Sequence, residues 1–437
     1  MALTFLRGGV HPPQRKKFTE GKAVETLPLP EKVFIPLIQH TGAVNVPTVS
    51  VGDAVKVGQK IGEAKAFISA PVHAAVSGKV AAISMYPHPV YGTGEAVVIE
   101  REGDDWVKLK RCSSYEALAP GEAKEIIRQA GIVGLGGAGF PTSVKISPPE
   151  HAEIETFILN GAECEPYLTS DYRLMVENAE EVVTGMRILM HVLGVGKGYI
   201  AIEDNKPEAY SEMKKALSSA PGIEVVLLRT KYPQGCEKQL IKAVLNREVP
   251  SGGLPLDVGV VVNNVATAVA VRDAVLPGKP LVERVVTVTG SDVVEPKNVR
   301  VRIGTPFKDL IDFCGGTAEP ISKLIAGGPL MGIAQYSLET PVIKGTCGII
   351  VLSSRDVPDF NPSECIRCGS CVDVCPMGLL PCELAVHAKN GRFEECGELG
   401  IADCMECGAC SYVCPARIPI TQFIKYGKAR IRSKVNL

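Results

Sequence analysis

Short runs of alternating apolar and polar residues fill the first hundred positions and predict β-strands. Valine and isoleucine are frequent in these runs, and glycine-containing turns lie between them. The predicted strands are Val44–Val51, Val55–Ile61, Val76–Ile83 and Ala96–Ile99. We therefore predict that residues 1–110 form an all-β domain.

The pattern changes after the charged stretch Arg101–Asp105. Apolar residues then recur at helical spacing over Glu116–Ala130, and a glycine-rich run follows with Gly134, Gly136 and Gly139 in a G-x-G-x-x-G arrangement. A Rossmann loop follows a strand and begins a helix, whereas this loop follows a helix and continues into Phe-Pro-Thr. The glycines still let backbone N–H groups approach a phosphate or a planar ring. A tight turn is the other interpretation of this loop.

Towards the C-terminus the pattern predicts two further domains. Val285–Thr289 and Val299–Ile303 are strand-like, and Pro306–Phe313 has the pattern of a short helix. We assign residues 281–355 to this mixed unit of strands and helix. Residues 356–437 contain most of the cysteines and are assigned to a separate domain.

Length and charge narrow the function classes. A chain of 437 residues is long enough for about three or four domains. The 47 basic and 48 acidic residues nearly cancel, which argues against nucleic acid as a partner. Only the segment from Arg417 onward departs from this balance, because it carries six basic residues and no acidic one. A solvated helical tail, or a docking patch for an acidic partner or an anionic membrane surface, would explain this segment.

No segment has the roughly 18 uninterrupted apolar residues that a membrane-spanning helix needs. The most apolar stretch, Val258–Val271, is broken by Asn263 and Asn264 and followed by charged residues. The first ten residues carry Arg7 and lead into His-Pro-Pro, which is not a signal-peptide pattern. We therefore expect a soluble, cytoplasmic chain, in a reducing compartment where cysteines serve as metal ligands.

Eight of the fifteen cysteines occur in two copies of a C-x2-C-x2-C-x3-C-P run, the spacing of a bacterial two-cluster ferredoxin. Three thiolates in one loop hold three corners of a cubane, and the fourth is carried to the other cluster. Zinc knuckles are the alternative, but they usually use separated C-x2-C hooks. The predicted ligands are Cys365, Cys368, Cys371 and Cys414 for one [4Fe-4S] cluster, and Cys404, Cys407, Cys410 and Cys375 for the other. The seven remaining cysteines, including Cys382 and Cys396, are expected to be buried apolar side chains.

Part of the first domain resembles a known carrier fold. The sequence Val51–Gly62, followed by Ala70-Pro71 and Ser77–Val80, resembles the biotinyl/lipoyl-type barrel-sandwich hybrid. In carrier domains of that family a lysine at a hairpin tip bears the cofactor. Lys65 lies near that point, but it lacks flanking methionines and lies too close to Ala70-Pro71. The resemblance therefore implies a structural hybrid motif without modification of the lysine.

Four stretches of the second domain resemble, in order, the flavin- and NADH-binding signatures of the NADH-oxidising flavoprotein subunit of respiratory complex I. They are Gly134–Lys145, Asn160–Tyr167, Tyr232–Glu237 and Val262–Thr267. The resemblance implies an α/β domain over residues 111–280 that binds FMN and NAD(H). The implied FMN-binding residues are Gly134, Gly136, Gly137, Gly139, Lys145, Asn160, Glu163, Gly235, Asn263, Asn264 and Thr267.

The same resemblance implies contacts to the dinucleotide. Glu165 and Glu237 would lie near the carboxamide and ribose of a nicotinamide stacked on the flavin, and Phe140 near the adenine. Two solvated loop acids are the other interpretation of Glu163 and Glu165. The chain departs from the complex I pattern at three positions, where an arginine, an aspartate and a glutamate are replaced by Leu135, Ala162 and Cys236.

The order of the domains, together with the opening sequence Phe5–Pro13, resembles the C subunits of Rnf ion-translocating ferredoxin:NAD oxidoreductases over essentially the whole chain. Residues 281–355 resemble the β-grasp SLBB module that follows the flavin domain in complex I, for which we expect a spacer role. The resemblance implies membrane subunits as partners and ferredoxin as an indirect electron donor or acceptor. It also implies a peripheral position on the cytoplasmic side of the bacterial cell membrane.

Cofactor chemistry accounts for this combination of parts. Nicotinamide exchanges a hydride, which is two electrons, a [4Fe-4S] cluster takes one electron, and a flavin can do both. We therefore expect hydride exchange between NAD(H) and FMN, and single-electron transfer through two clusters. A flavin and iron-sulfur reductase of the cobalamin reductase type is one alternative. A non-catalytic electron conduit with a scaffold flavin domain is the other.

Overall fold

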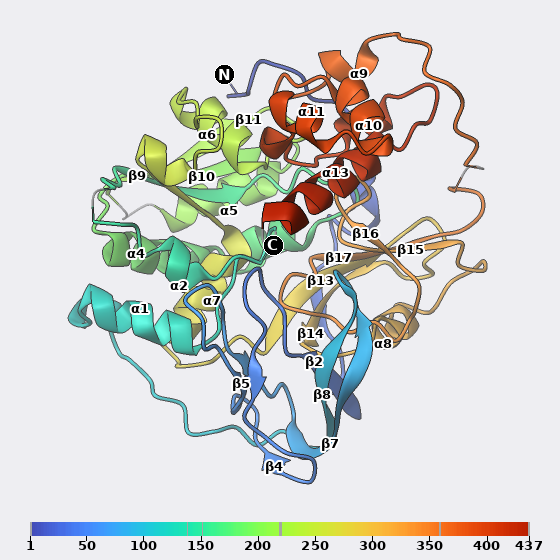
Figure 1. The fold of residues 1–437 in the computed structure, drawn as a ribbon. Helices are drawn as coiled ribbons and strands as arrows, with labels where there is room; N and C mark the ends of the chain where they lie inside the picture. The colour runs from blue at the N-terminus through green and yellow to red at the C-terminus, as the bar shows by residue number, and fades with distance from the viewer. Residues whose placement is uncertain (1, 138, 151, 218–220, 358–359, 436–437) are drawn as a thin grey trace.

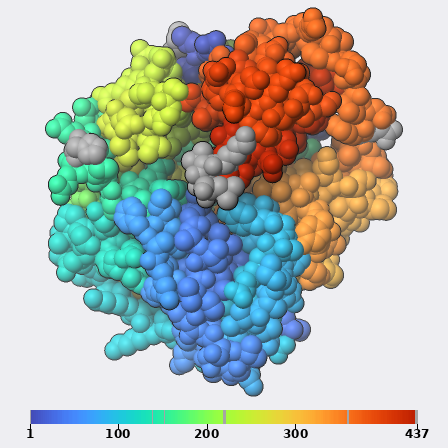
Figure 2. Space-filling view, in the orientation of Figure 1, coloured from blue at the N-terminus to red at the C-terminus, as the bar shows by residue number. Residues whose placement is uncertain are grey.

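Four β-sheets and the helices around them make up the part of the chain that the structure describes. The structure is a computed structural model, and it describes residues 2–137, 139–150, 152–217, 221–357 and 360–435. In Figure 1 the blue N-terminal sheets lie at the bottom, the green and yellow α/β domain on the upper left, and the orange and red helices on the upper right. Figure 2 shows that these three parts are in contact on the same face of the molecule.

The first hundred residues form two small sheets around one apolar core, as the sequence predicts. The orders are β2-β8-β7-β4 and β3-β5-β6, and Val33, Ile61 and Val97 lie between the sheets. The hairpin of β7 and β8 extends beyond the predicted apolar runs, because polar residues continue both strands with one exposed face. The strands are β2 (Lys32–Pro36), β3 (Val46–Pro47), β4 (Ala54–Val55), β5 (Lys60–Glu63), β6 (Val72–His73), β7 (Ser77–His88) and β8 (Gly92–Gly103).

A parallel sheet of four strands lies at the centre of the α/β domain. Its order is β11-β10-β9-β12, so the chain proceeds outward from β9 and then returns to the other side of β9 with β12. Ligands of such sheets bind where the strand order reverses, at the carboxyl ends of the strands. The strands are β9 (Thr156–Gly161), β10 (Gly198–Glu203), β11 (Ile223–Leu228) and β12 (Val260–Asn264). The helices are α1 (Pro120–Gln129), α2 (Thr142–Lys145), α3 (Ser170–Glu177), α4 (Ala179–Leu193), α5 (Pro207–Ala216), α6 (Glu237–Leu245) and α7 (Val265–Val275).

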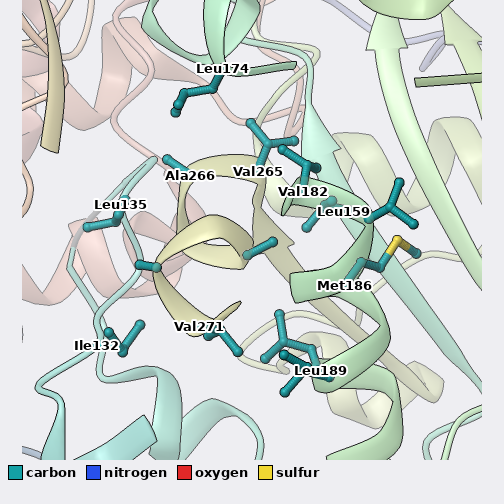
Figure 3. Packing of buried hydrophobic residues seen from close by; sticks show 14 of the residues in the cluster. Ile132, Leu135, Leu159, Leu174, Val182, Met186, Leu189, Val265, Ala266 and Val271 are labelled. Atoms are coloured by element: carbon teal, nitrogen blue, oxygen red, sulfur yellow. The ribbon is translucent and has the colours of Figure 1, made fainter. Parts of the chain in front are cut away.

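Apolar side chains cover both faces of this sheet. On one face, Leu159 of β9 packs with Met186 of α4 and Val265 of α7 in a core that Figure 3 shows from close by. Leu135 of the glycine-rich loop belongs to the same core, so that loop is anchored against α7. On the other face, α6 contributes Leu240 to a second core.

The third domain is a six-stranded mixed sheet with one helix packed on it. The order is β1-β14-β13-β17-β15-β16, and α8 contributes Phe307 and Leu310 to its core. The edge strand β1 comes from near the N-terminus, so the chain adds this strand before it enters the first barrel. The elements are β1 (Val24–Thr26), β13 (Glu283–Thr289), β14 (Lys297–Arg302), α8 (Phe307–Phe313), β15 (Lys323–Ala326), β16 (Ile333–Gln335) and β17 (Gly348–Leu352).

The last domain is helical, and its described residues from 360 onward contain no strand. Leu384, Ile420 and Ile424 form its core together with several cysteines. The helices are α9 (Ser370–Asp373), α10 (Pro381–Lys389), α11 (Phe393–Glu398), α12 (Ala409–Tyr412) and α13 (Ile420–Val435). Short 3-10 helices complete the fold at Lys16–Phe18, Tyr115–Ala117, Pro255–Val258 and Ile401–Asp403. Across the described residues, no helix is long and apolar enough to cross a membrane.

Candidate functional site

Two asparagine-containing strand ends lie at the reversal point of the parallel sheet. Asn160 near the end of β9 is directly opposite Asn264 at the end of β12. Parallel strands bring their carboxyl ends to one edge, and the order of this sheet reverses between β9 and β12. Two of the four predicted flavin-binding stretches therefore meet at the position where an open α/β sheet binds its ligand.

The glycine-rich loop lies against the same edge. The Leu135 N–H donates a hydrogen bond to Thr267 Oγ1 at 2.9 Å, which fixes the loop to the first turn of α7. A side chain at Gly136 would not fit, because its Cβ would lie 2.5 Å from Asn264 Nδ2. Gly137 has open space within 4 Å of its Cβ position. The loop thus has one side packed on the sheet edge and one side accessible to a ligand.

One buried amide donor at this edge has no partner. Asn160 donates to the Gly235 carbonyl at 2.8 Å, and Asn264 donates to the Asp171 carboxylate at 2.6 Å. Asn263 Nδ2 is buried and makes no hydrogen bond. Buried polar groups are nearly always hydrogen-bonded in folded proteins, so this donor fits a ligand with acceptor atoms. The ring system and phosphate of a flavin nucleotide supply such atoms.

Lys145 and Glu237 form an ion pair beside this edge. Lys145 at the end of α2 lies 2.5 Å from the Glu237 carboxylate at the start of α6. Both side chains are half-exposed, so neither depends on the other for solvation. Phe140, which was predicted near the adenine, is half-buried in the same loop, and its carbonyl accepts the Gly134 N–H at 2.9 Å.

The two acids of the loop after β9 have different surroundings, and neither is a freely solvated side chain. The Glu163 carboxylate accepts the backbone N–H groups of Asp171 at 2.8 Å and Tyr172 at 3.2 Å, which caps the start of α3. In this structure Glu163 therefore has a structural role at the helix start.

Gly235, another predicted flavin residue, lies close to Cys164. A Cβ added at Gly235 would be 3.1 Å from the Cys164 Sγ.

Glu165 faces the third domain. Its carboxylate accepts the N–H groups of Leu330 at 3.1 Å and Met331 at 2.7 Å, and the Tyr232 hydroxyl lies 3.4 Å away. Burial raises the pKa of Glu165 to about 7. The Tyr232 hydroxyl has a single proton, which it donates to the Cys407 carbonyl at 2.6 Å. A carboxylate has about four lone-pair sites, and Oε2 accepts only the Leu330 N–H, so a site on Oε2 remains for a further donor.

Asp171 is a buried acid that the sequence analysis missed. Its pKa is raised to about 7, first by burial and then by the nearby charge of Glu163, while the hydrogen bond from Asn264 opposes this shift. Arg284 of β13 also lies near Asp171. Nothing in the local sequence distinguishes Asp171 from a first-turn helix acid, since its neighbours come from β12 and β13.

The four cysteines predicted for the second cluster surround one pocket. Cys375, Cys404, Cys407 and Cys410 line one pocket together with apolar residues such as Ile424. Burial raises the pKa of the Cys404 thiol to about 11 and that of Cys407 to about 12. Bound iron would reverse this effect, because a coordinating thiol is deprotonated. The crossover of Cys375 to the other run is thus present in the geometry.

The four cysteines predicted for the first cluster are less closely gathered. Cys365 and Cys368 are exposed, whereas Cys371 is buried and Cys414 is half-buried. Burial and the nearby thiol of Cys382 raise the pKa of Cys371 to about 12. Among the described residues, no group of three or more His, Cys, Asp or Glu side chains is set to hold one metal ion. A cubane divides its four thiolates among four irons, so it needs a wider arrangement than a single ion does.

The seven other cysteines differ in part from expectation. Only Cys314 and Cys396 of the seven remaining cysteines are buried, and the other five are half-buried. They line domain contacts as well as cores, which spacing alone does not reveal. Lys65 is exposed between β5 and β6.

The basic C-terminal segment is partly packed. Lys428 donates a hydrogen bond to the Cys404 carbonyl at 2.8 Å and forms an ion pair with Glu406 at 2.9 Å. Part of α13 is therefore packed on the rest of the cluster domain and is not solvated.

The second cluster pocket adjoins the predicted flavin site. The Tyr232 hydroxyl donates to the Cys407 carbonyl at 2.6 Å, and Tyr232 is only 1% exposed. Val10, Tyr232, Cys407 and Ala409 form one apolar cluster, with Leu330 of the third domain packed against it. Three domains therefore meet between the flavin-binding stretches and the second cluster.

Four family models match the chain in the predicted order. They are the RnfC barrel sandwich hybrid domain over residues 4–104, the Nuo51 FMN-binding domain over 127–273, the SLBB domain over 285–334 and the 4Fe-4S dicluster domain over 357–418. The crystal structure of an NAD+-reducing [NiFe]-hydrogenase in the air-oxidized state has the same fold, with a TM-score of 0.51 and 20% identity over 68% of this chain and 59% of that chain. The predicted multidomain fold class is confirmed.

Three curated relatives cover most of the chain. The C subunit of the proton-translocating ferredoxin:NAD(+) oxidoreductase complex of Clostridium ljungdahlii is 52% identical over 99% of this chain and 95% of its own length. The C subunit of the Na(+)-translocating ferredoxin:NAD(+) oxidoreductase complex of Acetobacterium woodii is 45% identical, covering 89% and 88%. The C subunit of the ion-translocating oxidoreductase complex of Rhodobacter capsulatus is 43% identical, covering 98% and 83%. The chain therefore belongs to the family of C subunits of Rnf-type ion-translocating ferredoxin:NAD+ oxidoreductase complexes.

Proposed function

We propose that this chain exchanges electrons between NAD(H) and the other subunits of an ion-translocating ferredoxin:NAD+ oxidoreductase, through FMN and two [4Fe-4S] clusters. The observation that carries the proposal is the contact between the two candidate sites. Tyr232 belongs to a flavin-binding stretch, and its hydroxyl binds the carbonyl of the predicted cluster ligand Cys407. When bound, FMN converts the two-electron chemistry of nicotinamide into single-electron steps.

The residues present fit a flavin nucleotide. The accessible side of the loop at Gly137 and the unpartnered Asn263 Nδ2 both support binding of a group rich in acceptors. Thr267 and Asn264 keep the loop and the first turn of α7 in place. Lys145 supplies a cation close to this edge, as a phosphate requires. These residues bind and orient, and none of them needs to transfer a proton.

Glu165 is the residue we assign to the nicotinamide. Its remaining lone-pair site can accept an N–H group of the carboxamide. The amides of Leu330 and Met331 hold the carboxylate in one orientation and shield it from water. Glu237, half-exposed at the start of α6, is assigned to the ribose hydroxyls, and Phe140 to the adenine.

We assign the cluster bound by Cys375, Cys404, Cys407 and Cys410 to the inner position. Tyr232 contacts the Cys407 carbonyl of this pocket, so a cluster held by these four cysteines would be the one nearer to a bound flavin. The cluster bound by Cys365, Cys368, Cys371 and Cys414 would then face the partner, because two of its ligands are exposed.

The family also suggests the partners and the location. Relatives are named as subunits of ferredoxin:NAD+ oxidoreductase complexes that translocate H+ or Na+. We propose that this chain likewise docks on membrane subunits at the cytoplasmic side, with ferredoxin as an indirect electron donor or acceptor. The exposed part of the basic helix α13 is suited to an acidic partner or to anionic lipid.

An anaerobic NADH titration tests the proposal. The full chain is reconstituted with iron, sulfide and FMN, and the flavin and cluster absorbance bands are followed together. Bleaching of both bands is expected. If bound flavin stays oxidised while dithionite reduces the clusters, the NADH site is wrong.

A non-catalytic conduit is the second candidate, and one observation favours it. The carboxylates of Glu163 and Glu165 are both held by backbone N–H groups within the protein. In a conduit these bonds would be their whole function. A chain that loads both clusters but retains no FMN after gel filtration would support this candidate.

A further inference from the structure

The N-terminal segment, residues 3–16, lies outside the barrel, whose first strand begins at Lys32. It crosses the edge of the flavin-domain sheet instead. Leu3 donates to the Leu227 carbonyl at 2.8 Å and accepts the Arg229 N–H at 2.8 Å. Further along, Val10 and Tyr232 exchange two backbone hydrogen bonds at 2.8 and 2.9 Å. The segment is thus attached as an extra strand-like edge beside the flavin-binding stretches.

The middle of this segment contacts the loop that carries a cluster ligand. The Gly9 N–H donates to the Val374 carbonyl at 2.9 Å. Gly8 has a φ of +63°, and an added Cβ would lie 2.6 Å from the Cys375 carbonyl carbon. Only glycine allows so close an approach in this conformation. Cys375 is one of the four cysteines around the inner pocket.

The end of the segment holds the acidic loop. Lys16 is 3% exposed, and its Nζ donates to the carbonyls of Glu163 at 2.9 Å, Glu165 at 3.0 Å and Leu168 at 2.6 Å. An ammonium group has three donors, so these three carbonyls satisfy it completely. The loop needs such support, because Glu163 and Tyr167 both have positive φ values of 45° and 70°.

We propose that residues 3–16 form a positioning element of the electron-transfer site, in which Lys16 shapes the nicotinamide-binding loop and Gly8 sets the Cys375 loop against the flavin domain. This inference rests on the proposed function. The two contacts act on different steps. Loss of the Lys16 contacts should impair hydride exchange, and disturbance at Gly8 should impair transfer from flavin to cluster.

If residues 3–16 had only a structural role, a substitution in them would slow flavin reduction and cluster reduction to the same extent. Stopped-flow kinetics can therefore separate a positioning role from a structural one. The reconstituted full chain is mixed with NADH, and the flavin and cluster bands are recorded separately. For Lys16→Met we expect the rate of flavin reduction at low NADH to fall by about tenfold or more, since small misplacements of a binding loop have effects of that size. Reduction of its clusters by dithionite should be unchanged, and Lys16→Arg should recover part of the rate.

For Gly8→Ala we expect flavin reduction at the normal rate and cluster reduction slowed by about tenfold. Gly194→Ala is the matched control, because Gly194 has a φ of +68° and open space around its Cβ position. Val10→Ala provides a milder second variant if Gly8→Ala does not load clusters, since Val10 packs against Cys407 and Tyr232. Equal cluster-reduction rates in Gly8→Ala, Gly194→Ala and the parent chain would overturn the role of Gly8. If Gly8→Ala does not load clusters, an equal rate in Val10→Ala and the parent chain would overturn the positioning of the cluster by this segment.

The outcomes also separate this inference from the proposed function. If NADH does not reduce the flavin of the parent chain, the proposed function fails before any variant is compared. If the parent chain is active and Lys16→Met reduces its flavin normally, the positioning role of Lys16 is wrong. A Lys16→Met chain that slows both steps to the same extent would indicate a general structural role and would also contradict the inference.

Discussion

Replacement of Glu165 by glutamine tests the proposed nicotinamide site most directly. The carboxylate accepts two backbone N–H groups from the third domain, at 2.7 and 3.1 Å. A glutamine side chain has one acceptor oxygen, so one of these N–H groups would face an NH2 group. Hydrogen bonds to charged groups contribute about 1.5–3 kcal/mol each, and 1.36 kcal/mol is a factor of ten in rate. Glu165→Gln should therefore slow flavin reduction at low NADH by roughly 10- to 150-fold.

The pH dependence gives a second, independent signature. Burial raises the pKa of Glu165 to about 7, so the side chain is largely neutral at pH 6 and largely charged at pH 8. The charged form is the better acceptor for a carboxamide N–H. Flavin reduction in the parent chain should therefore become faster as the pH rises through 7. This rise should disappear in Glu165→Gln, whose side chain does not titrate.

The assay is anaerobic stopped-flow at pH 6, 7 and 8 with flavin content measured first. Asp171 also has a pKa raised to about 7, so it could cause a pH dependence in the same range. Loss of the pH dependence in Glu165→Gln would show that Glu165 causes it. Glu180→Gln, the same change at an exposed position in α4, is the control for the chemical substitution. Unchanged rates and an unchanged pH profile in Glu165→Gln would refute the assignment of this carboxylate.

Tyr232, Cys404 and Lys344 give further predictions. Tyr232→Phe leaves the Cys407 carbonyl without its donor, which should lower the free energy of unfolding by about 1–3 kcal/mol. In the same kinetic assay this variant should reduce its clusters more slowly and its flavin at the normal rate. Cys404→Ser should lower the iron content to about half, whereas Cys396→Ser, with a thiol outside the ferredoxin spacing, should keep all of it. Burial lowers the pKa of Lys344 to about 7. Between pH 7 and 10.5 this lysine is therefore protonated in the unfolded chain and neutral in the folded one. Its contribution to the free energy of unfolding should rise by about 1.4 kcal/mol per pH unit over this range. Urea unfolding of Lys344→Met at two pH values should lack this increase, and an equal increase in both chains would contradict it.

The sequence was most informative where function depends on spacing along the chain. The spacing of the two cysteine runs predicts the crossover of Cys375, and Cys375 lines one pocket with Cys404, Cys407 and Cys410 in the structure. The pattern of apolar and polar residues likewise predicted the strands of the first domain and the helix of the third domain, since these depend on local alternation. The close packing of Gly136 against Asn264, which excludes any larger residue, agrees with the glycine pattern of this loop.

Local sequence patterns could not predict the contacts between segments that are distant along the chain. Lys16 and Glu165 are 149 residues apart, and Tyr232 and Cys407 are 175 apart. Neither pair has a spacing that a motif could record. The resemblance predicts that Glu163 binds the flavin, and that assignment stays a prediction; the cap that its carboxylate forms on α3 was not predicted. A capping acid and a ligand acid look the same in a sequence, because the difference depends on which backbone N–H groups come within reach.

The barrel has a place in this arrangement that its resemblance to carrier domains does not suggest. The Thr41 N–H binds the Gly139 carbonyl at 3.2 Å, at the end of the glycine-rich loop. At the other end of the loop, Lys344 Nζ from the third domain joins the Gly131 carbonyl to the Pro71 carbonyl of the barrel, at 2.7 Å each. Backbone contacts of this kind need no cofactor on Lys65. The barrel therefore braces both ends of the loop that we propose binds the flavin, and these contacts support a structural role for the domain.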